Sequence, residues 1–180
     1  MREWRVAKIA YADPPYPGMA ERFYADDPRC AEVNHGELMH RLDREHDSWA
    51  LSTASVTLRE VLCVAPYGVR VAAWVKPFAS FKKYVNPAYA WEPVLFRTPN
   101  RTEYDGKTAR DFVACEITLK RGLTGAKPEA FCFWLFDLLG AKPEDEFSDL
   151  YPGTGGVTEA WETWRRRKLG QLVTGPLFAD

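Results

Sequence analysis

Two consecutive prolines that directly follow an apolar run constrain this chain more than any other stretch of its sequence. The apolar run, residues 6–11, predicts a buried strand, and the prolines belong to the motif Asp13-Pro14-Pro15-Tyr16. Neither proline has an N–H to donate to a sheet, and each favours extended geometry in the residue before it. The strand must therefore end in a stiff, extended loop. In open α/β sheets, ligands bind at the carboxyl ends of the strands.

This loop carries three groups that suit a planar base with an exocyclic amine. The carboxylate of Asp13 and the carbonyl of Pro14 can accept the two hydrogens of the amine, and the ring of Tyr16 can stack on the base. The same residues are equally consistent with a turn between strand and helix in which Asp13 only caps the next element. The motif therefore indicates a ligand site only if a second ligand-type motif occurs elsewhere in the chain.

A second ligand-type motif lies at residues 149–156, with the sequence Asp-Leu-Tyr-Pro-Gly-Thr-Gly-Gly. A predicted strand at 146–151 runs into this glycine-rich turn, and a predicted helix follows at 157–167. Glycines let the backbone approach a ligand, and a helix N-terminus offers free N–H groups. The turn is not a phosphate P-loop, because no Lys-Ser/Thr pair follows the glycines, and it is not a complete G-x-G-x-x-G. A tight strand-to-helix turn is the alternative.

The remaining patterns alternate between strands and helices. Apolar runs predict further strands, and helical spacing with start and stop signals predicts further helices, among them one opened by a capping box of Thr57 and Glu60 and one that starts at Pro128 and closes at Gly140. The strands are 49–53, 69–75, 90–97 and 112–119, and the helices are 36–47, 57–64 and 128–139. This alternation predicts an α/β fold, with a mainly parallel sheet and helices on both faces. The length of 180 residues predicts a single domain, 1–180.

The charge balance limits how the chain could bind nucleic acid. The formal net charge is −1, so binding would depend on a local patch. Aromatic residues alternate with Lys82 and Lys83 in the segment 77–87, which either faces nucleic acid or packs its aromatics on the sheet. The basic run 165–168 either contacts phosphate or forms a solvated helix C-terminus.

Cysteines and histidines indicate no metal or disulfide framework. The four cysteines are far apart and form no C-x-x-C pair, which favours a reducing, intracellular setting. His35, His40 and His46 do not share one helical face, so we expect solvated helix histidines. No apolar run approaches 18 residues, and the chain opens with a charged segment, so we expect a cytoplasmic protein without a membrane partner.

Taken together, the two motifs and the Lys127-Pro128 pair resemble the S-adenosylmethionine (SAM)-dependent amino-methyltransferases of DNA. With the catalytic motif first and the cofactor motif last, the order is similar to their circularly permuted β class and to related adenine methylases of phages and bacteria. The resemblance extends from about residue 6 to residue 164. It implies a Rossmann-like sheet and transfer of a methyl group from SAM to N6 of an adenine flipped out of DNA. In this family, Asp in place of Ser at the first motif position favours adenine N6 over cytosine N4.

The resemblance also implies roles for individual residues. In the catalytic motif, Asp13 and the Pro14 carbonyl would hold the target amine, Pro15 would stiffen the loop, and Tyr16 would stack on the base. Lys127 and Pro128 would lead into the helix that lines the methionine end of the cofactor. The implied cofactor-binding residues in the second motif are Asp149, Tyr151, Gly153, Thr154 and Gly155, with Tyr151 at a position where Phe is more usual.

Two departures from the family pattern keep other functions open. The family usually has an acidic residue that grips the ribose after the cofactor helix, whereas residues 170–178 contain none. Either the cofactor would bind weakly, or Glu159 or Glu162 would serve instead. No insertion is large enough for a separate target-recognition domain. Recognition would use residues 17–47 and 77–89, a second copy of the chain or another partner. The alternatives are an inactive nucleic-acid-binding or regulatory subunit, and a methyltransferase acting on RNA, on a free nucleotide or on cytosine N4.

Overall fold

A computed structural model describes residues 5–18, 32–77, 83–99, 108–117 and 126–173 of the chain. Strands and helices alternate in the first and last parts of these residues, and three successive strands lie between them with no helix described there. In chain order the elements are β1 (Lys8–Ala12), α2 (His35–Glu45), β2 (Ser48–Ser52), α3 (Leu58–Cys63), β3 (Arg70–Val75), β4 (Trp91–Arg97), β5 (Phe112–Ala114), α4 (Glu129–Leu138), β6 (Glu146–Asp149) and α5 (Gly156–Val173).

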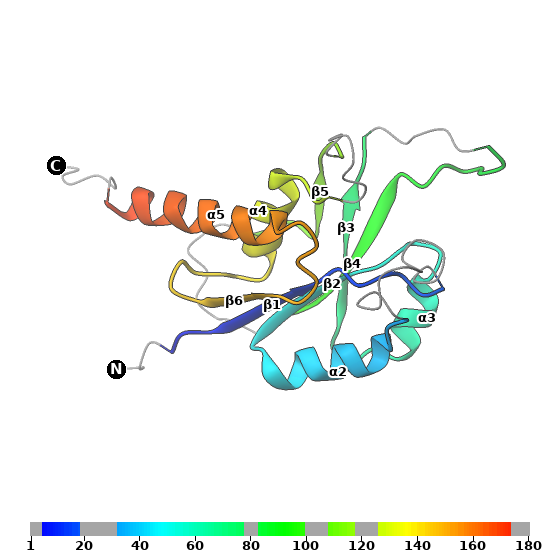
Figure 1. Cartoon of the computed structure of the whole chain (residues 1–180), viewed down its shortest axis with the longest axis horizontal. Coiled ribbons are helices and arrows are strands. Elements are labelled where there is room, and N and C mark those ends of the chain that lie inside the picture. Colours follow the sequence, from blue (N-terminus) through cyan, green and yellow to red (C-terminus); the bar gives the residue numbers. More distant parts are fainter. Residues whose placement is uncertain (1–4, 19–31, 78–82, 100–107, 118–125, 174–180) are drawn as a thin grey trace.

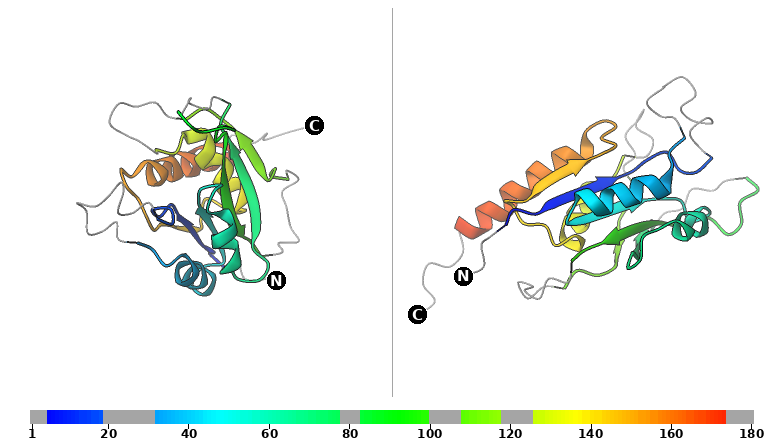
Figure 2. Two further views of the ribbon diagram at one scale, coloured as in Figure 1. Left: turned by 90° about the vertical axis from the view of Figure 1, so that its right-hand side faces the viewer. Right: turned by 90° about the horizontal axis from the view of Figure 1, so that it is seen from below.

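The strands form one six-stranded, mainly parallel sheet in the order β5-β3-β4-β2-β1-β6 (Figure 1). Strand β1 is parallel to both of its neighbours, β2 and β6, and β3 is parallel to β5. Strand β4 is antiparallel to β2 and β3, between which it lies. Helices cover both faces, α2 and α3 on one and α4 and α5 on the other (Figure 2). The predicted α/β class is confirmed.

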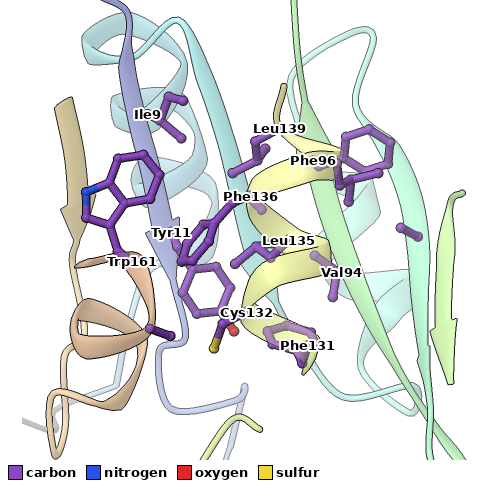
Figure 3. Packing of buried hydrophobic residues seen from close by; sticks show 14 of the residues in the cluster. Ile9, Tyr11, Val94, Phe96, Phe131, Cys132, Leu135, Phe136, Leu139 and Trp161 are labelled. Carbon is purple, nitrogen blue, oxygen red and sulfur yellow. The ribbon is translucent and has the colours of Figure 1, made fainter. Parts of the chain in front are cut away.

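The core has one layer on each face of the sheet. Ile9 and Tyr11 of β1 pack against α4 and α5, together with Phe131, Phe136 and Trp161 (Figure 3). The residues that alternate with them on β1, Ala10 and Ala12, face the α2 layer. A strand buried on both faces is apolar throughout instead of alternating with polar residues, which explains the continuous apolar run before the two prolines.

The loops that leave β1 and β6 diverge to opposite faces of the sheet. The chain passes from β1 to α2 on one face, and from β6 to α5 on the other. Because these two strands are adjacent and parallel, their carboxyl ends form a topological switch point, where open α/β sheets bind ligands.

Three details of the elements differ from the sequence predictions. The strand predicted at 112–119 is only Phe112–Ala114, since pairing with β3 stops at Val75, and residues 118–119 lie outside the described residues. Thr57 makes no capping hydrogen bond, because its hydroxyl donates to the Ala54 carbonyl at 3.2 Å instead. The last helix continues beyond residue 167, to Val173.

The expectation of solvated histidines is wrong for His35. This residue opens α2, is 6% exposed and has Nδ1 2.9 Å from the Val33 carbonyl oxygen. Its burial follows from the close packing of the first turn of α2 on the end of α3, where a Cβ at Gly36 would lie 3.3 Å from the Val64 Cβ. No group of three or more His, Cys, Asp or Glu side chains suited to a metal ion occurs among the described residues. Within the same residues, no helix combines the length and apolarity needed to cross a membrane.

Candidate functional site

The two sequence motifs lie side by side at the carboxyl edge of the sheet. Tyr11 of β1 is paired in register with Asp149 of β6, and the Leu150 N–H donates to the Tyr11 carbonyl at 2.9 Å. Asp13 follows β1 and the glycine-rich turn follows β6, so both loops leave the sheet at one place. Their proximity therefore results from the pairing of the first described strand with the last.

Lys127 lies between the first motif and the antiparallel strand. Its side chain is 4% exposed, and its Nζ is 3.2 Å from Asp13 Oδ2 and 2.5 Å from Glu92 Oε1. The residue directly precedes α4, whose N-cap is Pro128, and the ring of Phe131 in the first turn of that helix lies 5.7 Å from Nζ. Packing of α4 on the sheet thus carries the lysine into the site.

Glu92 and Lys76 extend this group, and neither was predicted from the sequence. Glu92, on β4, has a side chain that is 9% exposed, and its Oε2 is 2.8 Å from Lys76 Nζ. Lys76 directly follows β3 and lies 4.5 Å over the Trp74 ring. A glutamate within an otherwise apolar strand was the signal in the sequence, because a fully buried carboxylate requires a charged partner.

The four charged groups form a chain of alternating sign: Lys76, Glu92, Lys127 and Asp13. Burial tends to raise the pKa of Glu92, but the ammonium groups of Lys127 and Lys76 hold it below its usual range. Burial raises the pKa of Asp13, and Glu92 and Asp149 add to this effect while Lys127 opposes it. Burial opposes the charge of Lys127, yet its anionic neighbours, Asp13 foremost, raise its pKa well above the usual range. Lys127 is therefore a fixed cation.

The neighbouring buried groups stay neutral. Beneath Asp13, the Tyr11 hydroxyl and Ser52 Oγ are 2.7 Å apart, and burial and the Asp13 charge raise the pKa of Tyr11 well above its usual range. Burial raises the pKa of the Cys132 thiol to about 12, so this thiol is not a ready nucleophile.

One carboxylate oxygen of Asp149 accepts a hydrogen bond, and the other has no partner among the described residues. The Thr158 hydroxyl donates to Oδ2 at 3.2 Å. Burial raises the pKa of Asp149, while the Thr158 hydroxyl lowers it. Oδ1 is buried and has no hydrogen-bond partner among the described residues. An orphaned buried acceptor is rare in folded proteins, so it indicates a missing donor such as a ligand group.

The glycine-rich turn is open on its outer side. Gly153 and Gly155 have φ of 50° and 83°, in the left-handed region where glycine is favoured, and a Cβ at either would meet nothing within 4 Å. Tyr151 is half-buried and packs against the α2 layer, whereas Thr154 is exposed. In the other loop, Pro14 is buried, and Pro15 and Tyr16 are half-buried. The glycine-rich turn therefore leaves room for a ligand on its outer side.

Of the two helix acids considered for the ribose, Glu162 is paired with Arg165 at 3.3 Å. Together with Asp149 and Thr158 it lines a groove of about 440 Å³ between β6 and α5. Glu159 is not among the residues that line this groove. The usual acidic residue for the ribose is absent from the sequence of residues 170–178, of which 174–178 lie outside the described residues.

The basic run 165–168 lies in the interior of α5. The interpretation of this run as a solvated helix C-terminus is therefore wrong. Arg167 pairs with Glu129 at 3.1 Å, and Lys168 pairs with Asp137 at 3.2 Å. Both acids lie on α4, so the run joins two helices.

Comparisons with known proteins support the fold. The chain is similar to the crystal structure of the M1.HpyAVI–SAM complex, with a TM-score of 0.60 and 14% identity over 89% of this chain and 79% of that one. For the crystal structure of M1.HpyAVI, the TM-score is 0.58 and the identity 11%, over 89% of this chain and 77% of that one. No protein-family model matches the chain, and no curated protein matches it. The chain thus has the fold of the DNA methyltransferase M1.HpyAVI.

Proposed function

We propose that this chain transfers a methyl group from SAM to the N6 amine of adenine in DNA. The observation that carries the proposal is the placement of the Asp13 loop beside the Asp149 loop, at the switch point of the sheet. One loop offers acceptors for an amine and the other offers an open glycine turn with an unsatisfied carboxylate oxygen. The fold shared with M1.HpyAVI, which was solved with SAM, supports the cofactor class.

The residues of the second loop fit SAM by charge and by shape. SAM carries positive charge on its sulfur and its amino group, and Asp149 Oδ1 is an acceptor without a partner among the described residues. The backbone from Gly153 to Gly155, with Thr154, leaves room for a ligand. Asp149, Tyr151 and this turn would hold the cofactor, and Lys127 and Pro128 would border its methionine end. When bound, SAM supplies a methyl carbon that accepts the lone pair of the amine as the carbon–sulfur bond breaks toward sulfur.

The first loop would hold and orient the target amine. The Asp13 carboxylate and the Pro14 carbonyl would accept its two N–H groups, which directs the nitrogen lone pair away from the loop. The negative charge of Asp13 also favours the positive charge that develops on the nitrogen. The surplus proton would leave through the Asp13 carboxylate to solvent. Tyr16 would stack on the flipped base.

We further propose that DNA approaches along the connection between β3 and β4. Strand β3 is parallel to β1 within the sheet, so β3 ends, and β4 begins, at the edge that holds Asp13 (Figure 1). Residues 83–90 of the connection, which lead into β4, therefore lie toward this edge. Tyr84 is 91% exposed there, which argues against packing of this ring on the sheet, and the Lys83 ammonium lies 4.9 Å from its centroid. Exposed aromatic rings beside cations suit stacked bases. Phe78, Phe81 and Lys82 lie outside the described residues.

One observation favours a second candidate, an inactive binding or regulatory subunit. Asp13 Oδ2 already faces the Lys127 ammonium at 3.2 Å, so an amine must share this carboxylate with a buried cation. The two candidates differ in whether any base becomes methylated.

The deciding experiment is a methylation assay read by mass spectrometry of the digested nucleosides. Purified protein would be incubated with SAM and with duplex DNA, single-stranded DNA or RNA. We expect N6-methyladenine in DNA, and a loss of roughly 100-fold or more in Asp13→Ala, because the acceptor of the amine is removed. The matched control is Asp111→Ala, an exposed aspartate just before β5, which should keep full activity.

Other products would identify the alternatives. Methylated RNA or N4-methylcytosine would change the substrate, and binding of SAM without any methylated base would support the inactive subunit.

A further inference from the structure

We infer that Glu92 is a positioning residue for this reaction: by sharing the Lys127 ammonium, it leaves the Asp13 carboxylate oxygens available to the target amine. The inference rests on the proposed function, and it concerns a residue on β4, outside both sequence motifs.

Lys127 pairs with both Glu92 and Asp13. Lys127 Nζ is 2.5 Å from Glu92 Oε1 but 3.2 Å from Asp13 Oδ2. The second oxygen of Glu92 is engaged by Lys76 at 2.8 Å, so both oxygens have a cationic partner and the carboxylate cannot turn away. Because the side chains of Lys127 and Glu92 are almost fully buried, water cannot replace either partner at low cost.

Sharing of Lys127 between two carboxylates suits an acceptor that must hold an amine. If Lys127 paired with Asp13 alone, an ammonium group would compete with the target amine for the same oxygens. If Lys127 were absent, Asp13 would face Glu92 and Asp149 with no cation between them and would tend to take up a proton. A lysine shared with Glu92 avoids both outcomes.

The charged and titratable groups that face Asp13 come from four parts of the fold. They are Tyr11 on β1, Glu92 on β4, Lys127 before α4 and Asp149 on β6. Lys127 lowers the pKa of Asp13, and Glu92 raises it by a smaller amount. Removing one or the other must therefore shift the ionisation of Asp13 in opposite directions.

The first test is the pH profile of methylation in two variants. In Glu92→Gln, Lys127 has Asp13 as its remaining anionic partner, and the negative charge that raised the pKa of Asp13 is removed. The acidic limb of kcat/KM should therefore move to lower pH. The plateau of kcat should fall about tenfold, because the amine now competes with the lysine. In Lys127→Met, the acidic limb should move to higher pH by about one unit or more, because an adjacent cation lowers a carboxyl pKa by that amount.

The second test does not require activity. The carboxyl carbon of Asp13, labelled with ¹³C and assigned with Asp13→Asn, would be titrated by NMR in the folded wild type and in both variants. If Lys127→Met unfolds because it leaves Glu92 without its closer partner, the double variant Glu92→Gln/Lys127→Met removes both charges. Its Asp13 should still titrate at higher pH than in the wild type, since Lys127 has the larger influence.

The outcomes separate this inference from the proposed function. Opposite shifts of the Asp13 titration and of the acidic limb support the inference. A pair with only a structural role would lower the melting temperature of the variants and leave both curves in place, which would overturn it. A wild type without methylation at any pH would overturn the proposed function, while the NMR titration would still decide whether Glu92 and Lys127 set the charge of Asp13.

Discussion

Asp149 combines a fixed carboxylate oxygen with an unsatisfied one. Thr158 holds Oδ2, so the orientation of the side chain is set before any ligand arrives, and Oδ1 is buried without a partner among the described residues. Such preorganisation lowers the entropy cost of binding, because the acceptor does not have to be ordered by the ligand. The residue is therefore well suited to contact a cationic or hydrogen-bond-donating group of a cofactor.

We predict that Asp149→Asn weakens SAM binding about tenfold or more, the usual effect of losing a hydrogen bond to a charged group. Isothermal titration calorimetry would measure the dissociation constant. Glu116→Gln is the matched control, because Glu116 is exposed and follows β5, at the opposite edge of the sheet from β6. Equal dissociation constants for Asp149→Asn and the wild type would place the cofactor elsewhere.

At the scale of elements, α5 and the β3–β4 connection both carry basic residues but in different surroundings. The run on α5 is engaged with acids of α4, through Arg167–Glu129 and Lys168–Asp137. All four side chains are substantially exposed, so each pair contributes only about 0–1 kcal/mol to stability. On the β3–β4 connection, Lys83 lies over an exposed tyrosine ring instead of an acid. The two elements should therefore respond differently to DNA.

We predict that Lys83→Gln lowers DNA affinity and reduces the slope of log K against log salt by about one, because one phosphate contact is lost. Arg167→Gln is the comparison variant and should leave both quantities unchanged. Fluorescence anisotropy at several salt concentrations would measure them. A loss of affinity in Arg167→Gln with none in Lys83→Gln would move the DNA interface to α5.

At the scale of the whole molecule, β4 connects the helix layers of both faces by ion pairs. Arg97, at its carboxyl end, pairs with Asp43 of α2, and Glu92, at its amino end, pairs with Lys127 before α4. Burial tends to raise the pKa of Asp43, but its hydrogen bonds with Arg97 and Trp49 hold that pKa below its usual range, as Lys127 and Lys76 do for Glu92. Carboxyl groups with lowered pKa values stabilise the folded state when ionised.

We predict that the stability supplied by Glu92 is fully present above about pH 4.5, its reference pKa, and is lost as the pH falls through its lowered pKa. The difference in unfolding free energy between the wild type and Glu92→Gln should therefore shrink between pH 7 and pH 3. Urea denaturation at a series of pH values would measure it. Glu60→Gln, an exposed position on α3, is the control and should show no such trend. A difference independent of pH would contradict the prediction.

Local patterns in the sequence determined most of the elements and both loops. Apolar runs, Pro14 and Pro15, and the glycines after β6 act within short windows, because strand and helix spacing and backbone restrictions are properties of neighbouring residues. The strand before the prolines, the helix after Pro128 and the mainly parallel sheet were therefore predictable. The roles of the residues in the two loops remain predictions.

Only the tertiary structure decided which charges meet. Strand β4 is antiparallel, so its amino end, with Glu92, lies at the edge where β1 and β6 end. This places Glu92 beside Lys127 and Asp13, which are far from it in the sequence. The same holds for the basic run of α5, whose partners lie on α4. The reason is physical: spacing along the chain sets the period of an element, whereas strand order and direction, which result from packing of the whole sheet, set the distances between charges.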